Sequence, residues 1–232
     1  MKLGDRLLSC AELVKKGNIA ADIGADHAYL SIYLLEKGIC PHVYVSDLRE
    51  MPLAAGMRNA IRAGITENIT FCLSDGLKNL PMEQIETIIC AGMGGDNIIG
   101  ILSADATICS SEYQLILQPQ SSVHVLRRWL SEQGFSVIRE KLSQEGRFIY
   151  TAMEVYYGKH NVLSPGQQFI PDILLKSGDP LLPTYFSKVK KSVQMSVDGL
   201  HKSKYTNSQL LDYYETAFAE LNEMGSAYGL NK

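Results

Sequence analysis

The sequence is poor in cysteine and arranges none of it in a pattern that metals or disulfides use. Its five cysteines are scattered and odd in number, and no two of them form a C-x-x-C pair. A disulfide framework and a zinc site are therefore both disfavoured, and we expect no metal. Isolated cysteines of this kind are typical of small buried residues in a reducing compartment.

Long apolar runs and a large net charge are also absent. The first 17 residues carry Asp5, Arg6 and Glu12 among their leucines, unlike a signal peptide, and no later stretch approaches the length of a membrane span. We therefore expect a cytoplasmic protein without a membrane partner. The formal charge of −3 argues against a nucleic-acid-binding protein coated in positive charge, but it leaves room for a local basic patch.

What the sequence does have is an apolar content of 46% over 232 residues, enough for one sizeable domain and a smaller one. Strand-like and helix-like segments alternate along it. Strands are expected at 18–23, 42–46, 69–73, 87–91 and 113–117, and helices at 28–37, 51–63 and 123–133. This alternation predicts a parallel sheet with helices on both faces. Two more strands, at 135–140 and 148–157, predict an antiparallel edge, which favours a methyltransferase over a dinucleotide-binding fold.

The composition changes after residue 159. Four prolines fall within 161–183, which predicts a linker with room for one short helix. Apolar residues then recur at spacings of three and four over 186–200 and again over 210–224. This periodicity predicts an α-helical hairpin of coiled-coil type with its turn near 201–207. We therefore expect a catalytic, cofactor-binding domain at 1–160, and a linker with a helical hairpin at 161–232.

The first predicted strand ends in Asp22-Ile23-Gly24-Ala25-Asp26-His27. A dinucleotide site would need the three glycines of G-x-G-x-x-G here, and only Gly24 is present. S-adenosylmethionine carries no phosphate, so one glycine suffices where it passes the backbone, and a nearby carboxylate can hold its ammonium group. We assign Asp22 and Gly24 to these roles, although an acid and a glycine close many strands.

Acidic residues also close the second and third predicted strands. Asp47, followed by Leu48, would lie where a carboxylate can hold both ribose hydroxyls, or it caps the next helix. Asp75 can accept the amine of an adenine while Gly76 lets the chain turn near the ring, or the two form an ordinary turn. The carboxyl ends of parallel strands share one sheet edge. We therefore expect Asp47, Leu48, Asp75 and Gly76 all to bind the cofactor.

Three glycines lie close together after the fourth predicted strand, in Ala91-Gly92-Met93-Gly94-Gly95. A backbone this free of side chains lets a ligand approach closely. We assign Ala91, Gly92 and Met93 to the cofactor, and Gly94 and Gly95 to the substrate; a wide turn before the next helix is the alternative. Gln118, at the end of the fifth strand, either reads a base edge or ties down the loop.

Together these motifs resemble one known family, the bacterial tRNA (adenine-N1)-methyltransferases that act on adenine 22 in the D-loop region. The resemblance rests on Asp22-Ile23-Gly24-Ala25-Asp26-His27, Ser46-Asp47 with Pro52-Leu53, Asp75-Gly76-Leu77, Ala91-Gly92-Met93-Gly94-Gly95 and Gln118-Pro119. It spans the catalytic domain, and the helical C-terminal extension suits the family. The Asp-His and Ala-Gly-Met-Gly-Gly motifs are specific, whereas the other acids are shared by methyltransferases generally. Gln120 departs from the asparagine expected after Gln-Pro, and its longer side chain changes any base contact there.

The resemblance implies a Rossmann-like class I methyltransferase domain with a seven-stranded sheet, S-adenosyl-L-methionine as cofactor, tRNA as substrate and a coiled-coil hairpin. Adenine N1 can attack the sulfonium methyl directly, so positioning is the main catalytic task, and a structured base must first be unpaired or flipped. The methylated ring is a cation, and we expect Asp26, with His27 beside it, to stabilise that charge while Tyr29 stacks on the base. The alternatives are that Asp26 caps the helix, that His27 is a partly buried structural histidine, and that Tyr29 packs in the core.

Lysines gather on the first helix of the predicted hairpin, including Lys188, Lys190 and Lys191, while the second helix is acidic. A basic stripe that grips tRNA phosphates and charge pairing within the hairpin both fit this pattern. Two other functions compete: a methyltransferase for a protein or small molecule, and a non-catalytic RNA-binding module on a methyltransferase fold. The complete set of acidic strand ends counts against the second. The sequence suits a monomer without fixing the oligomeric state.

Overall fold

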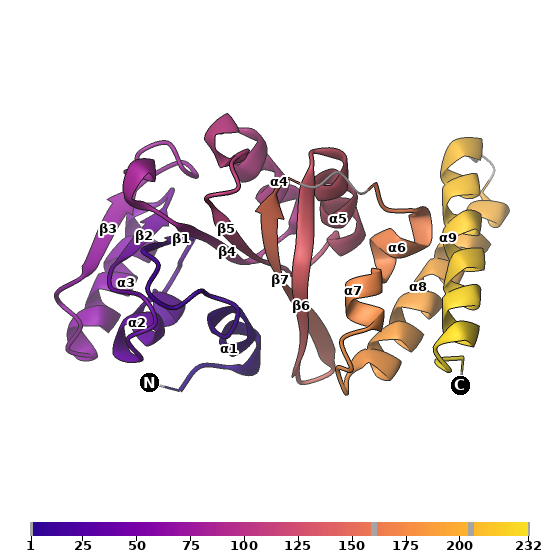
Figure 1. Ribbon diagram of the computed structural model, residues 1–232, viewed down its shortest axis with the longest axis horizontal. Helices are drawn as coiled ribbons and strands as arrows, with labels where there is room; N and C mark the ends of the chain where they lie inside the picture. The colour runs from indigo at the N-terminus through magenta and orange to yellow at the C-terminus, as the bar shows by residue number, and fades with distance from the viewer. Residues whose placement is uncertain (1, 159–161, 204–206, 232) are drawn as a thin grey trace.

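The computed structural model describes residues 2–158, 162–203 and 207–231, and its centre is one sheet of seven strands (Figure 1). The strands are β1 (Ala20–Ile23), β2 (Val43–Asp47), β3 (Ile69–Leu73), β4 (Thr87–Met93), β5 (Gln114–Pro119), β6 (Phe135–Glu145) and β7 (Phe148–Tyr157). Their order in space is β3-β2-β1-β4-β5-β7-β6. The first five run parallel, whereas β7 runs antiparallel to both β5 and β6. The predicted antiparallel hairpin is confirmed, with β6 as the edge strand.

Helices cover both faces of this sheet. The described helices of the catalytic part are α1 (Asp5–Ala11), α2 (Tyr29–Glu36), α3 (Glu50–Arg62), α4 (Gly95–Ser103) and α5 (Val123–Glu132), with short 3-10 turns η1 (Met82–Gln84) and η2 (Ala106–Ile108). The helices predicted at 28–37, 51–63 and 123–133 occur as α2, α3 and α5 within one residue at each end. No helix in the described part of the chain is long and apolar enough to cross a membrane.

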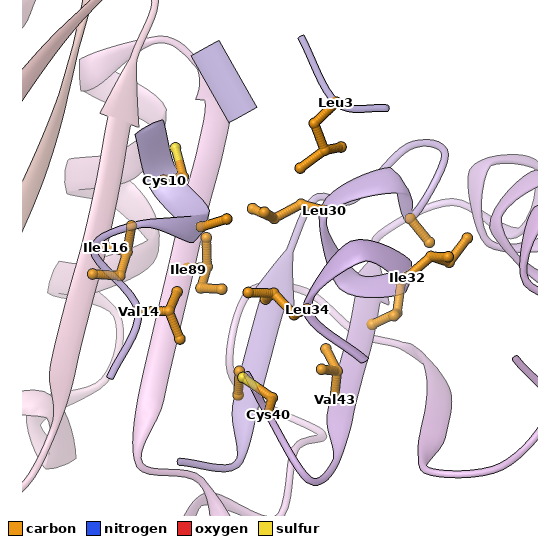
Figure 2. Packing of buried hydrophobic residues seen from close by; sticks show 14 of the residues in the cluster. Leu3, Cys10, Val14, Leu30, Ile32, Leu34, Cys40, Val43, Ile89 and Ile116 are labelled. Carbon is orange, nitrogen blue, oxygen red and sulfur yellow. The ribbon is translucent and has the colours of Figure 1, made fainter. Parts of the chain in front are cut away.

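Successive side chains of β4 point to opposite faces of the sheet, and both faces are buried. This explains why the strands have continuous apolar runs in the sequence. Ile88 and Ile89 are both fully buried, yet they belong to different apolar clusters on opposite faces of the sheet. The cluster of Ile89 includes Cys10 of α1 and Leu34 of α2, both labelled in Figure 2. The cluster of Ile88 includes residues of α4 and α5. Burial on both faces is what a parallel sheet requires.

The C-terminal helices pack against the β6 end of the sheet (Figure 1). They are α6 (Pro165–Phe169), α7 (Asp172–Leu175), α8 (Leu182–Lys202) and α9 (Ser208–Ala227). A third apolar cluster joins Leu142 of β6 to Phe169, Leu174, Phe186 and Leu221 of these helices. The proline-rich stretch predicted as a linker with one helix thus forms two short helices with buried side chains. The predicted domain boundary at 160 and part of the predicted turn fall on residues 159–161 and 204–206, outside the described residues.

A buried ion pair also ties these helices to the catalytic part. Arg127 of α5 pairs with Glu140 of β6, and neither side chain is more than 1% exposed. The Arg127 Nη1 donates hydrogen bonds to the carbonyl oxygens of Gln168 and Phe169, at 3.1 and 2.6 Å. Because both carbonyls belong to α6, one guanidinium holds α5, β6 and α6 together. Loss of either charge would leave the other buried and uncompensated.

Candidate active site

Two adjoining cavities lie along the edge where the parallel strands end. The larger, of about 770 Å³, is bordered by the ends of β1, β2 and β4 and by the segment after β3. The smaller, of about 370 Å³, lies between α1, the end of β1 and the start of α2. Gly24, Asp26 and Gly92 border both cavities. The predicted site residues that border one or both are Asp22, Gly24, Asp26, His27, Tyr29, Asp47, Leu48, Asp75, Gly76, Ala91, Gly92 and Met93.

Asp22 lies at the buried side of the smaller cavity. The residue is only 4% exposed, and the Ser31 hydroxyl donates a hydrogen bond of 2.6 Å to its Oδ2. Burial raises the pKa of this carboxyl to about 6, against the lowering effect of Ser31, because the charged form loses its water. A ligand that brings an ammonium group would supply the countercharge that this buried acid needs.

Asp47 and Asp75 border the larger cavity in different surroundings. Asp47 is 6% exposed, and its Oδ1 accepts a hydrogen bond of 2.9 Å from the backbone N–H of Arg49. It does not cap α3, because Arg49 is the N-cap of that helix and no side chain caps it. Asp75 is exposed and pairs with Lys78 at 2.6 Å. A surface pair of this kind is weak, so the Asp75 carboxylate is easily available to a ligand.

Glycines shape the boundary between the two cavities. Gly24 has a φ of +70°, and a Cβ built on it would lie 2.9 Å from the Met93 Cε. Gly92 has a φ of +84°, and its N–H donates to the Gln118 side chain. Gly95 serves packing, since a Cβ there would lie 2.7 Å from the carbonyl oxygen of Ser122. Gly94 is the N-cap of α4. Neither Gly94 nor Gly95 is among the described residues that border the cavities.

Asp26 and His27 stand half-exposed where the cavities meet. The His27 Nε2 lies 3.5 Å from the Asp26 Oδ2, and the two side chains are 51% and 62% exposed. The His27 ring stacks on that of Tyr29, with centroids 5.3 Å apart, and Asn59 donates to the carbonyl oxygen of His27 at 3.1 Å. Asp26 does not cap α2, whose N-cap is Ala28 with no side-chain hydrogen bond. The alternative that Asp26 caps this helix is therefore wrong.

Comparison with known proteins reveals the family. The methyltransferase-domain family matches residues 3–153. A tRNA (adenine(22)-N(1))-methyltransferase of Bacillus subtilis is 28% identical over 193 residues, which is 83% of this chain and 78% of the relative. A Mycoplasma genitalium protein assigned as a tRNA methyltransferase is 33% identical over 154 residues, 65% of this chain and 68% of the relative. The chain belongs to the bacterial tRNA (adenine(22)-N1)-methyltransferase family.

A solved relative matches this methyltransferase along nearly its whole length. It is the Streptococcus pneumoniae protein assigned as a tRNA (m1A22) methyltransferase, in complex with S-adenosyl-L-methionine. Its identity to this chain is 28% and the TM-score is 0.80, with 95% of this chain and 99% of that chain covered. The match therefore includes the C-terminal helices as well as the sheet. The Rossmann-like seven-stranded methyltransferase fold is confirmed.

Gln118 is committed to contacts inside this methyltransferase. It is fully buried, and its Oε1 accepts hydrogen bonds from the Arg6 Nη1 at 2.6 Å and from the Gly92 N–H at 3.1 Å. Its Nε2 donates to the carbonyl oxygen of Pro119 at 3.0 Å. These contacts favour the role of tying down the glycine loop over that of reading a base. The next amide, Gln120, uses its backbone N–H to donate to the Met93 carbonyl oxygen at 2.9 Å.

Arg6 is a site residue that the sequence did not single out. It comes from α1 and borders the smaller cavity together with Asp22. The strand-end rule could not find it, because α1 precedes the sheet and the arginine reaches the site through its long side chain. The sequence of α1 carries no signal for it either, because Asp5 stands beside Arg6 and the two read as an ordinary pair of charged residues.

The three lysines of α8 do not form the predicted pairs with α9. Lys188 donates to the Arg147 carbonyl oxygen at 2.6 Å, and Lys190 donates to the Asn231 Oδ1 at 2.7 Å. Within the described ranges, no salt bridge joins either of them or Lys191 to a carboxylate. Lys188 and Lys191 are exposed. No group of three or more potential metal ligands occurs among the described residues.

Proposed function

We propose that this protein transfers the methyl group of S-adenosyl-L-methionine to N1 of adenine 22 in tRNA. The observation that carries the proposal is the placement of Asp22, Asp47 and Asp75 around two meeting cavities, in a chain of this family. The Bacillus subtilis relative carries that activity in its name, and the Streptococcus pneumoniae relative was solved with that cofactor. The localisation follows the substrate, so we expect the enzyme in the cytoplasm.

The residues fit the cofactor part by part. Asp22 is a carboxylate whose burial raises its pKa to about 6, and an ammonium group would supply a countercharge. Asp47 offers its Oδ2 to the ribose hydroxyls, since the backbone N–H and the guanidinium of Arg49 both lie beside its Oδ1. Asp75 and Gly76, at the far side of the larger cavity, suit the amine and ring of the adenine. When bound, the cofactor supplies an electrophilic methyl group on a sulfonium.

The chemistry asks little of the protein beyond placement and charge. As the N1 lone pair of adenine forms the new bond, the bond from the methyl carbon to sulfur breaks and its electron pair stays on sulfur. The adenine becomes cationic while the sulfonium is neutralised. A carboxylate beside the ring then stabilises the transition state more than the ground state. Asp26 suits this role, because it stands at the junction of the cavities and is open to the substrate side.

The aromatic pair and the lysines suit the RNA. His27 and Tyr29 form a stacked, half-exposed pair at the mouth of the smaller cavity, where an unpaired base can stack. Lys188 and Lys191, exposed on α8, suit phosphates of the tRNA body. Lys188 also contacts the β6–β7 turn through Arg147, and Glu145, the last residue of β6, pairs with Arg6 at the smaller cavity. The basic helix is thus linked to the active site by direct contacts.

Nucleoside mass spectrometry tests the proposal directly. Unmodified tRNA made by transcription is treated with enzyme and S-adenosyl-L-methionine, then digested to nucleosides. We expect 1-methyladenosine from a transcript that has adenine at position 22, and none from a transcript that has guanine there. Methylation of both transcripts would overturn the position, and methylation of a protein fraction instead of tRNA would favour the competing substrate class. A protein that binds tRNA but not S-adenosyl-L-methionine would support the non-catalytic RNA-binding alternative.

A further inference from the structure

The turn between β6 and β7 projects beyond the sheet edge that carries the two cavities. β7 pairs antiparallel with β5, and Met153 stands opposite Leu117. The position opposite Pro119, the last residue of β5, is therefore Thr151. Phe148 lies three residues further along β7, and three residues of extended strand span about 10 Å. The tip of this hairpin thus stands out from the sheet at the end where α1 lies (Figure 1).

An aromatic side chain is exposed at this tip. Phe148 is 53% exposed and belongs to none of the three apolar clusters of the described residues. The Arg147 guanidinium lies over its ring, 4.9 Å from the centroid. One exposed apolar side chain needs no explanation by itself, so the surroundings of the ring decide what it can bind.

Those surroundings are basic. Lys188 of α8 reaches the turn and donates to the Arg147 carbonyl oxygen at 2.6 Å. Among the residues described, no carboxylate forms a salt bridge with Arg147 or Lys188. Glu145 stands opposite Phe148 in the hairpin, but Arg6 compensates its charge at 3.5 Å. An aromatic face beside unpaired cations is the combination that binds an unpaired RNA strand, through its bases and its phosphates.

A row of contacts leads from the tip to the smaller cavity. The rings of Phe148 and Tyr150 lie 6.2 Å apart, and the Arg6 guanidinium stands 5.9 Å from the centroid of the Tyr150 ring. Arg6 borders the smaller cavity, and so do His27 and Tyr29 with their stacked rings. An RNA strand whose target base enters this cavity can therefore lay a nearby nucleotide on the tip.

We propose that Phe148 is a stacking platform for an unpaired base of the tRNA near adenine 22, and that Lys188 holds a phosphate of the same strand. This platform rests on the proposed tRNA substrate. Arg147 covers one face of the ring, and the base stacks on the other face. An aromatic face accepts any base, so the platform selects an unpaired strand and not a sequence. Stacking there offsets part of the free energy that unstacking the target region costs.

Filter binding of tRNA to variants at Phe148 measures the platform. Truncation of a stacking aromatic to alanine weakens RNA binding by roughly five- to 150-fold for each stacked base. We expect a loss in this range for Phe148→Ala and for Phe148→Leu, which keeps an apolar side chain without a π face, and little change for Phe148→Trp. The slope of the salt dependence should stay the same, because no charge is removed. Ile138→Ala, at a 44% exposed residue of the same hairpin, is the matched control and should bind tRNA normally.

Removal of the base instead of the ring shows whether the two touch. Each tRNA of a series carries one abasic nucleotide at a position near adenine 22. We expect one of these tRNAs to bind the unaltered enzyme more weakly by about the factor that Phe148→Ala causes, and to bind the variant no more weakly than intact tRNA does. If every abasic tRNA weakens both proteins equally, no base stacks on Phe148 and the proposal is wrong.

Failure of the platform and failure of the tRNA substrate give different results. An unaltered enzyme that neither binds nor methylates tRNA contradicts the proposed function. An unaltered enzyme that methylates tRNA, together with a Phe148→Ala variant that binds it equally well, contradicts the platform alone. Calorimetry with S-adenosyl-L-methionine should show unchanged affinity in the variant, because Phe148 borders neither cavity. Equal losses of tRNA binding in the alanine and tryptophan variants would make the ring a support for the turn and overturn the proposal.

Discussion

Asp22→Asn should stabilise the ligand-free protein at neutral pH even though it weakens cofactor binding. The reason is the burial of this carboxyl, which raises its pKa from an ordinary 3.8 to about 6. Above pH 6 the folded protein must keep a charge in a buried site whose donors are the hydroxyl and the backbone N–H of Ser31, while the unfolded chain keeps the same charge in water. The asparagine has nearly the same size and carries no charge.

The sign of the pH dependence follows from proton binding. Between pH 3.8 and about 6, the folded state holds a proton on Asp22 that the unfolded chain has lost. The free energy of unfolding due to this group therefore falls as the pH rises through that window. The difference between the two pKa values corresponds to roughly 3 kcal/mol, at about 1.4 kcal/mol for each pKa unit. This is the largest stabilisation that the asparagine variant can show, reached above about pH 7.

Urea unfolding of both proteins across this range measures the effect. We expect the free energies of unfolding to be similar near pH 4 and to separate progressively, with the variant more stable by about 1–3 kcal/mol near pH 8. Asp75→Asn is the matched control, because that carboxylate is exposed and paired with Lys78. It should give no comparable separation. A separation at Asp22 that is constant with pH, or of opposite sign, would refute the reasoning.

The cofactor should reverse the order of stability. Saturating S-adenosyl-L-methionine stabilises any protein that binds it only when folded, in proportion to its affinity. The unaltered enzyme should therefore gain more from the cofactor than Asp22→Asn does. Equal gains in both proteins would remove Asp22 from the ammonium site.

Three further predictions concern binding and turnover. Asp47→Ala should weaken cofactor binding by roughly 1.5–3 kcal/mol in calorimetry, and an unchanged affinity in a folded variant would exclude Asp47 from the ribose site. Asp26→Asn should bind cofactor and tRNA nearly normally but lose much of its single-turnover rate; a rate within about twofold would contradict a chemical role. Glutamate at Lys188, Lys190 and Lys191 should weaken tRNA binding and flatten its dependence on salt, which filter binding over a salt series measures. The same charge reversal at Lys15, Lys16 and Lys37 should leave that slope unchanged. These exposed lysines lie in the segments that lead into β1 and β2, at the amino ends of the parallel strands.

The sequence predicts the fold well where one physical pattern dominates. The third and seventh strands have the predicted bounds, because each is a run with high strand propensity bounded by turn residues. The sixth strand extends to Glu145, five residues beyond its predicted end. Its last part contains Lys141, Ser143 and Gln144, which do not favour strands on their own. Pairing with β7 over that whole length supplies the backbone hydrogen bonds that keep it extended.

The sequence also predicts most residues of the site, for a topological reason. Parallel strands bring their carboxyl ends to one edge, so an acid after each strand is enough to place Asp22, Asp47 and Asp75 around the same cavities. Contacts made by long side chains between distant segments leave no such pattern. The Arg6–Gln118 hydrogen bond joins α1 to β5 across 112 positions. No spacing rule relates those two residues, so the part of the cavity wall formed by Arg6 could not be predicted, and the sequence could not decide between the two roles of Gln118.

The three acids differ in how far their charges are already compensated. Asp75 is exposed and pairs with Lys78, and Asp47 is buried with the backbone N–H and the guanidinium of Arg49 beside its Oδ1. Asp22 is buried with the hydroxyl and the backbone N–H of Ser31 and, among the described residues, without a salt bridge. A ligand charge gains most where compensation is least, because it then replaces lost hydration instead of competing with an existing partner. The ionic part of cofactor recognition should therefore be concentrated at β1. The acids of β2 and β3 then serve mainly to orient the neutral ribose and adenine.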